Sequence, residues 1–100
     1  MTHYQVIAHH HIDPDQDLDE VLALYPPLAE ASRQEPGNVS FRVYRQLDDE
    51  RAVVVLERYT SRAAFAEHQR TPHFEDILLA QIVPRLRERT REAYDVPPAE

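Results

Sequence analysis

The chain has 100 residues, a formal net charge of −7 at pH 7, 42% apolar residues, a single glycine and no cysteine. This length and apolar content suit one packed core, so we expect a single domain over residues 1–100 with a loose tail at 97–100. The lack of cysteine excludes disulfides, thiolate nucleophiles and zinc sites built on sulfur. The acidic balance opposes nucleic acid as a partner, because that affinity rests on cationic side chains at the phosphates.

Signals for a membrane or a polyanionic partner are weak in this sequence. Glutamates are interleaved with the one basic cluster, which is typical of a solvated strip and consists of Arg85, Arg87, Arg89 and Arg91. No window approaches the ~20 apolar residues that span a bilayer, and the N-terminus has no basic segment followed by an apolar stretch. We therefore expect no membrane partner and a cytoplasmic location.

The first two elements are predicted to be a strand and a helix. Residues 4–12 read as a strand that places on one face Tyr4, Val6, Ala8, His10 and Ile12. The apolar spacing becomes helical from Asp17, with Glu20 three residues later as in a capping box. Prolines at 26 and 27 remove two amide donors, so this helix should kink or restart at Pro27 and continue towards Gln34.

A pair of antiparallel strands is predicted next. Residues 39–47 alternate between apolar and polar side chains, which is the period of a half-buried strand. Residues 52–59 form an apolar, β-branched run in which both faces of the strand should be buried. The short polar connection at 48–50 favours a hairpin between the two strands.

Two helical segments and a last strand complete the chain. Thr60 or Ser61 can cap a helix that ends near His68, and Thr71-Pro72 fits a cap followed by proline at the first helical position. The second segment should run from Pro72 to about Val83 and bury Phe74, Ile77, Leu78 and Ile82. Residues 88–96 alternate weakly and are predicted to form the final strand.

The order strand, helix, strand, strand, helix, strand predicts an α+β protein with the ferredoxin-like βαββαβ fold and a four-stranded antiparallel sheet. Helices on one side leave the other face of such a sheet uncovered. Because residues 53–59 are apolar on both faces, we expect a second copy of the sheet to cover the open face. The protein is therefore predicted to be a homodimer.

Four short motifs, taken in their order and spacing, resemble the antibiotic biosynthesis monooxygenase family. They are a Glu-Pro-Gly turn leading into the strand at 35–44, a Glu-x-aromatic strand end at 57–59, a helix at 61–68 that ends in histidine, and a Pro-His-Phe restart at 72–74. With the first strand and helix, the resemblance covers nearly the whole chain. Each motif is short, so the combination carries the similarity.

The resemblance implies a dimeric α/β barrel, in which two ferredoxin-like protomers pack sheet to sheet and each holds a pocket between its sheet and helices. Members of the family oxygenate polyphenols such as anthrones or quinols without metal or flavin, while others degrade haem or isomerise small sugar-derived signals. Tyr59 stands here where Trp is more usual, and His10 occupies the first-strand position at which haem-degrading members have Asn. Both departures speak against haem degradation.

Cofactor-free oxygenation needs a base that removes a phenolic or enolic proton, and a dry pocket that holds the resulting anion. Imidazole suits the first task, so His10 and His68 are the candidate bases, and turnover would fall as pH drops through the pKa of the responsible histidine. A substrate oxygen could accept a hydrogen bond from the third catalytic candidate, Tyr59. The residues expected against the substrate are Phe41, Phe65 and His73. Purely structural roles are the alternative for His10, for Tyr59 as an anchor of the strand end, and for His68 through a hydrogen bond to a neighbouring backbone group.

Two further features of the sequence bear on charge and metals. Glu57 lies between apolar neighbours and must be paired or protonated, so we expect an arginine partner, Arg42 or Arg58, and a structural role. His9 and His11 project to one side of the first strand and could share an ion. No third ligand stands at a recognisable spacing, so neither a metal nor another cofactor is expected.

The leading functional hypothesis is a cofactor-independent, monooxygenase-like enzyme that oxidises a small aromatic polyphenol or quinol with O₂. Its partners would be the aromatic substrate, O₂ and a second copy of the chain. One alternative is a non-catalytic protein that sequesters a small metabolite, and a haem-degrading or isomerase member is another. No glycine-rich phosphate loop or nucleophile elbow occurs, which excludes nucleotide-dependent and α/β-hydrolase chemistry.

Overall fold

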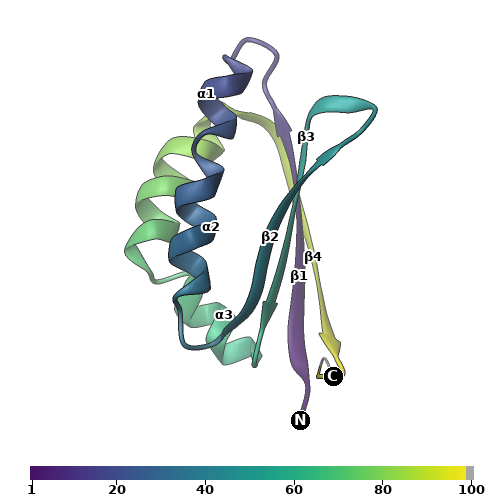
Figure 1. Ribbon diagram of the computed structural model, residues 1–100, viewed down its shortest axis with the longest axis vertical. Helices are drawn as coiled ribbons and strands as arrows, with labels where there is room; N and C mark the ends of the chain where they lie inside the picture. Colours follow the sequence, from purple (N-terminus) through teal and green to yellow (C-terminus); the bar gives the residue numbers. More distant parts are fainter. Residues whose placement is uncertain (99–100) are drawn as a thin grey trace.

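The computed structural model describes residues 1–98, whose strands form one antiparallel sheet in the order β2-β3-β1-β4. The strands are β1 (His3–Ile12), β2 (Asn38–Gln46), β3 (Asp49–Tyr59) and β4 (Leu86–Val96). All helices lie against one face of the sheet (Figure 1). The ferredoxin-like α+β fold predicted from the sequence is confirmed. Within residues 1–98, no helix is both long enough and apolar enough to cross a membrane.

The first helical region is split into α1 (Leu18–Leu22) and α2 (Tyr25–Arg33). The Asp17 carboxylate accepts a hydrogen bond from the backbone N–H of Glu20 at 3.0 Å, so the predicted start is confirmed. The restart comes at Tyr25, two residues before the predicted position. Both prolines then occupy the first turn of α2, where a helix needs no amide donor.

The second helical region consists of α3 (Arg62–His68), the π-helix η1 (Phe74–Ile82) and a short 3₁₀ turn, η2 (Val83–Arg85). Ser61 caps α3 by accepting a hydrogen bond from the backbone N–H of Ala64 at 3.1 Å. A helix was predicted at the position of η1, but its wider winding was not. The buried side chains of η1 stand four residues apart at 74, 78 and 82, whereas Ile77 is only half-buried.

The register of the sheet decides which side chains meet beneath the helices. On β1 the buried positions are Val6, Ala8, His10 and Ile12, which is the face predicted from the alternation. β3 presents Glu57 opposite Val6, and β4 presents Arg89 opposite His10 and Arg91 opposite Ala8. β4 begins at Leu86, two residues before the predicted start, and is exposed along most of its length.

The other face of the sheet is apolar at its centre and lacks a covering element in the described part of the chain (Figure 1). Val54 and Leu56 of β3 are half-buried there, and Tyr44 and Tyr94 are 48% and 50% exposed. Within one chain, the prediction that both faces of residues 52–59 are buried therefore holds for the helix side, whereas on the outer face Ala52 is buried and Val54 and Leu56 are half-buried. Pro97 and Pro98 follow β4 without regular structure, and residues 99–100 of the predicted tail lie outside the described residues.

Candidate active site

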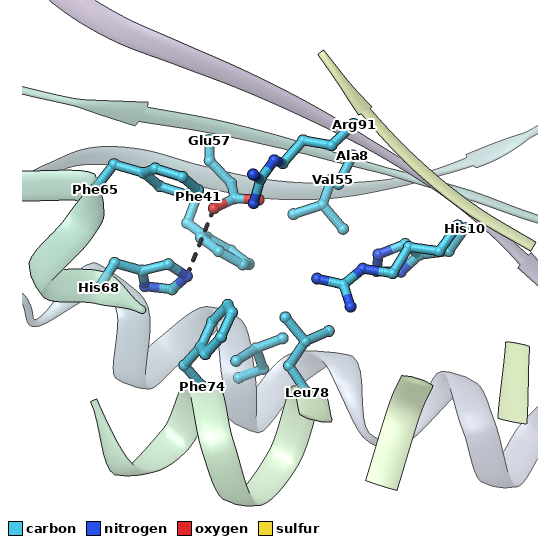
Figure 2. A pocket seen from close by; sticks show the side chains of 12 residues that line it. Ala8, His10, Phe41, Val55, Glu57, Phe65, His68, Phe74, Leu78 and Arg91 are labelled. Carbon is cyan, nitrogen blue, oxygen red and sulfur yellow. Dashed lines mark ion pairs between the residues drawn. The ribbon is translucent and has the colours of Figure 1, made fainter. Parts of the chain in front are cut away.

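A cavity of about 30 Å³ lies between the sheet and the helices. Its apolar wall consists of Ala8, Leu28, Phe41, Val55, Phe65, Phe74 and Leu78, and its polar groups come from His10, Glu57, His68, Arg89 and Arg91. Figure 2 shows Glu57, His68 and Phe65 gathered at one end and His10 at the other. Four of the residues singled out in the sequence, two histidines and two phenylalanines, thus lie around one cavity.

Glu57 is a carboxyl group buried in this wall, with only 6% of its residue surface exposed. Burial raises the pKa of Glu57 to about 7, although the hydrogen bond from Tyr59 and the charge of Arg91 oppose the rise. The Tyr59 hydroxyl donates to Glu57 Oε1 at 2.6 Å. Figure 2 shows the Arg91 side chain reaching over the same end of the cavity.

The arginine partner expected for Glu57, Arg42 or Arg58, was the wrong choice. Successive residues of a strand point to opposite faces, so Arg58 leaves the sheet on the outer side, where its Nε donates to Gln5 at 2.9 Å. Arg42 stands opposite Leu56 and shares that outer face. The positive charges that act on Glu57 come instead from β4, from Arg91 and Arg89.

His68 stands between two carboxyl groups. Its Nδ1 lies 2.7 Å from Glu35 Oε2 and its Nε2 lies 3.6 Å from Glu57 Oε1. Because a carboxylate only accepts hydrogen bonds, Nδ1 carries the proton, and the lone pair of Nε2 faces Glu57. Burial lowers the pKa of His68, while Glu35 raises it. The ring is therefore held as a neutral base directed at Glu57. Its Nδ1 is bonded to the Glu35 carboxylate, whereas a purely structural role would have paired it with a neighbouring backbone group.

His73 lies beside this group and not in the wall of the cavity. Its Nε2 is 2.6 Å from the same Glu35 oxygen that binds His68. Glu35 belongs to the Glu-Pro-Gly turn between α2 and β2, whereas His68 ends α3 and His73 precedes η1. One carboxylate therefore ties together three segments that are distant in sequence.

His10 is buried at the opposite end of the cavity. Its Nδ1 lies 2.7 Å from the Tyr25 hydroxyl of α2. Burial, aided by the charge of Arg89, lowers the pKa of His10 to about 4. His10 is thus neutral at physiological pH, and with so low a pKa it is a weak proton acceptor.

Tyr59 is fully buried in a second cluster with Val6 and Phe65. Burial raises the pKa of the Tyr59 hydroxyl well above its ordinary range. Since this hydroxyl donates to Glu57, it is committed to orienting that carboxyl group. The geometry makes Tyr59 a positioning residue for Glu57 instead of a donor to a substrate.

His9 and His11 do not converge on one point. His9 Nε2 lies 2.9 Å from Glu92 and His11 Nε2 lies 2.8 Å from Asp49, which belong to different strands. Each imidazole is thus paired with its own carboxylate on the outer face of the sheet.

Several residues of the site were missed or misjudged in the sequence. Arg89 and Arg91 had been assigned to a solvated strip, yet both line the cavity, because the register of β4 on β1 places them opposite His10 and Ala8. A signal existed in their spacing of two, which puts both on one face of a strand. The pairings of Glu35 with His68 and of Tyr25 with His10 left no signal, because the partners lie 33 and 15 residues apart in the chain.

The chain resembles proteins of known sequence and structure along most of its length. It is 32% identical over 57 residues to the candidate monooxygenase YcnE of Bacillus subtilis, a match that covers 57% of this chain and 60% of YcnE. It is 31% identical over 67 residues to the uncharacterized protein sll1783 of Synechocystis sp., covering 67% of this chain and 45% of that protein. The chain thus spans less than two thirds of either relative.

Solved structures share the whole fold. A crystal structure of an antibiotic biosynthesis monooxygenase superposes with a TM-score of 0.86 at 32% identity, covering 95% of this chain and 99% of the other. Rv0793 from Mycobacterium tuberculosis superposes with a TM-score of 0.78 at 29% identity, covering 98% and 96%. The model of the family "Antibiotic biosynthesis monooxygenase" matches residues 4–78, which hold the first three strands and most of the candidate site. The chain belongs to the antibiotic biosynthesis monooxygenase family.

Proposed function

We propose that this protein is a monooxygenase-like enzyme that oxidises a small aromatic polyphenol or quinol with O₂ in the cavity between sheet and helices, without a cofactor. One observation carries the proposal: a buried carboxyl group, Glu57, stands beside a neutral imidazole in an apolar cavity that also has two guanidinium groups in its wall. A base and fixed positive charges are what proton removal from a phenol requires.

Glu57 is the group that takes the substrate proton in this proposal. It lies in the cavity wall, Tyr59 fixes its orientation, and the His68 Nε2 lone pair stands 3.6 Å from it. A proton accepted by Glu57 can therefore be shared with His68, whose other nitrogen is anchored on Glu35. His68 and Glu57 act as one unit, and His10 has a pKa too low to compete as the base.

The two arginines in the cavity wall stabilise the substrate anion that remains after proton removal. Arg89 and Arg91 line the same cavity, and the Arg91 guanidinium lies 5.2 Å from the centre of the Phe65 ring. A phenolate or enolate held near these cations is electron-rich enough to pass one electron to O₂. For an anthrone, recombination of the two radicals forms a carbon–oxygen bond at the ring carbon that began as CH₂. Loss of water from the resulting hydroperoxide converts this carbon to a carbonyl, so one O₂ supplies the carbonyl oxygen and the oxygen of one H₂O.

Substrate entry requires the cavity to open. About 30 Å³ holds roughly two water molecules, far less than the roughly 300 Å³ at which ligand pockets begin. Arg89 and Arg91 are exposed residues on the edge strand β4, so their long side chains are the part of the wall that needs the least free energy to move. They would then close over the bound ring and exclude water.

We also propose a cytoplasmic location and a homodimer joined through the outer faces of the two sheets, as in the dimeric α/β barrel. The apolar centre of that face, with Ile7, Val54 and Leu56, supports the dimer.

The experiment that tests the function is oxygen uptake with a panel of quinols and anthrones, measured with an electrode. A catalytic protein consumes O₂ in proportion to the product formed. A protein that only sequesters the metabolite also binds a panel member, and the fluorescence of the bound compound changes. Such a protein does not raise O₂ uptake above the rate in buffer. That result would refute the proposed function in favour of the binding protein.

A further inference from the structure

We propose that Glu35, His68 and His73 form a binding site for one divalent transition-metal ion, of the zinc or iron(II) class. The inference goes beyond the proposed function, which uses the metal-free chain. It is carried by the position of three ligand atoms, Glu35 Oε2, His68 Nδ1 and His73 Nε2, which all lie within 4.8 Å of one another.

The three ligand atoms lie at hydrogen-bond distances, somewhat closer together than the ligands of one ion. Glu35 Oε2 is 2.7 Å from His68 Nδ1 and 2.6 Å from His73 Nε2. A metal ion sits about 2.1 Å from each nitrogen or oxygen ligand, so tetrahedral ligands stand about 3.4 Å apart. A small withdrawal of the Glu35 side chain from the two rings opens that space. Two imidazoles and one carboxylate are a ligand set that zinc and iron(II) accept.

The surroundings of His68 supply an independent argument. A histidine that binds a metal usually donates its other ring N–H to a carboxylate, which orients the ring. The second nitrogen of His68, Nε2, already faces Glu57 Oε1 at 3.6 Å (Figure 2), and Tyr59 fixes that carboxyl group. Loading the site therefore needs a change of tautomer at His68, from a proton on Nδ1 to a proton on Nε2, and a change at His73, whose Nε2 now donates to Glu35.

The charge of the cluster also favours a bound cation. The side chains of Glu35 and Glu57 are only 11% and 8% exposed. Among the described residues, no arginine lies within ion-pair distance of either carboxyl group, and the chain contains no lysine. A dication would compensate Glu35, whose partners are two imidazoles, and the nearby Glu57, whose neighbours are the Tyr59 hydroxyl and His68.

Three protein ligands leave the ion at least one open position, which distinguishes this site from a closed structural one. His73 is the most accessible ligand, with 17% of its side chain exposed, and provides the entry path. The ion would fasten the α2–β2 turn to the end of α3 and to the start of η1.

Cobalt(II) and zinc titrations of protein stripped with EDTA test the proposal. We expect one Co²⁺ per chain with visible d–d absorption, displacement by Zn²⁺, and a change in the ¹⁵N spectrum of His68 from the Nδ1–H to the Nε2–H tautomer. His73→Gln should weaken binding by at least about 100-fold, and Glu57→Gln by about 10- to 100-fold through the loss of the outer carboxylate. Circular dichroism checks that each variant is folded.

The matched control is the double variant His9→Gln/His11→Gln, which removes the surface histidines able to bind metal incidentally. It should bind Co²⁺ as wild type does. The proposal is overturned if wild type binds no ion, if His73→Gln titrates like wild type, or if the control variant loses the binding. None of these readouts uses turnover, so a protein without oxygenase activity can still pass or fail the test.

Discussion

Two buried ionisable residues of the cavity have pKa values displaced in opposite directions. Burial disfavours the charged form of either group, so it lowers the pKa of His10 to about 4 and raises that of Glu57 to about 7. Both groups are therefore mostly uncharged in the folded protein between about pH 4 and about pH 7. Their effects on folding stability follow from the same shifts and have opposite signs.

The His10 shift predicts an acid-dependent loss of stability. Between pH 6.5 and pH 4 the unfolded chain binds a proton at His10 that the folded chain does not, so the free energy of unfolding falls as pH drops through this range. The shift of about 2.5 pKa units corresponds to about 3 kcal/mol at most. Urea unfolding at several pH values measures this loss.

Glu57 has the opposite effect. Because folding raises its pKa from 4.5 to about 7, its contribution to the free energy of unfolding is lost as pH rises through that window. The variant His10→Gln isolates the contribution of His10, since Gln can still bond the Tyr25 hydroxyl but does not titrate. The free energy of unfolding of wild type relative to that of the variant should fall steadily from pH 6.5 to pH 4. Parallel curves would show that His10 is not held neutral.

The residues of the candidate site were only partly predictable from the sequence. The alternation in β1 and the family motifs singled out His10, His68, Phe41 and Phe65, and these four side chains line one cavity. The face of His10 was predictable because strand parity is a local property. The partners of Glu57 were not predictable, because they depend on the register of β4 against β1 and on the packing of α3 across the sheet. Long-range register leaves no local pattern in one sequence.

At the scale of elements, α3 approaches the α2–β2 turn closely at Gly37. A Cβ atom at position 37 would overlap the Ala64 side chain, and the Gly37 carbonyl accepts a hydrogen bond from the Thr60 N–H at 2.9 Å. The single glycine of the chain thus allows the turn that carries Glu35 to lie against the helix that carries His68.

Gly37→Ala is predicted to destabilise the protein by about 1–3 kcal/mol, because neither the turn nor α3 can move freely. For a chain of this size each kcal/mol lowers the melting temperature by about 4–8 °C, which calorimetry measures. Ala64→Gly in the same chain should recover part of the loss, although glycine within a helix itself costs about 1 kcal/mol. Additive effects of the two substitutions would rule out the contact.

The elements themselves were largely predictable, and their deviations have local causes. The strands followed from alternation, and the starts of α1 and α3 followed from Asp17 and Ser61 as capping residues. The shift of the helix restart to Tyr25 reflects the tolerance of the first turn for proline. The π-helical winding of η1 was not predictable, because its apolar residues at 74, 77, 78 and 82 fit an α-helix equally well.

For the whole molecule, the outer face of the sheet is the main unassigned surface. Helices cover the inner face only (Figure 1), and the outer face presents half-buried Ile7, Val54 and Leu56. A second sheet packed on this face would bury these side chains in the proposed dimer.

Sedimentation is expected to give about 23 kDa, twice the 11.7 kDa of one chain. Leu56→Glu should convert the dimer to a folded monomer, because it places a charge at the centre of the interface. Leu79→Glu is the matched control, since Leu79 is 42% exposed on η1 and far from that face. A monomeric wild type at micromolar concentration would contradict the dimer.

The most direct test of the account is oxygen consumption by Glu57→Gln with a quinol or anthrone that the wild type oxidises. Gln keeps the shape of Glu57 but cannot take a proton, so kcat should fall by about 10²- to 10⁴-fold while the fold is retained. Glu88→Gln, the same change at an exposed position of β4, should leave kcat unchanged. Both variants are measured after EDTA treatment. A Glu57→Gln protein that consumes oxygen at the wild-type rate would contradict the assignment of Glu57 as the base.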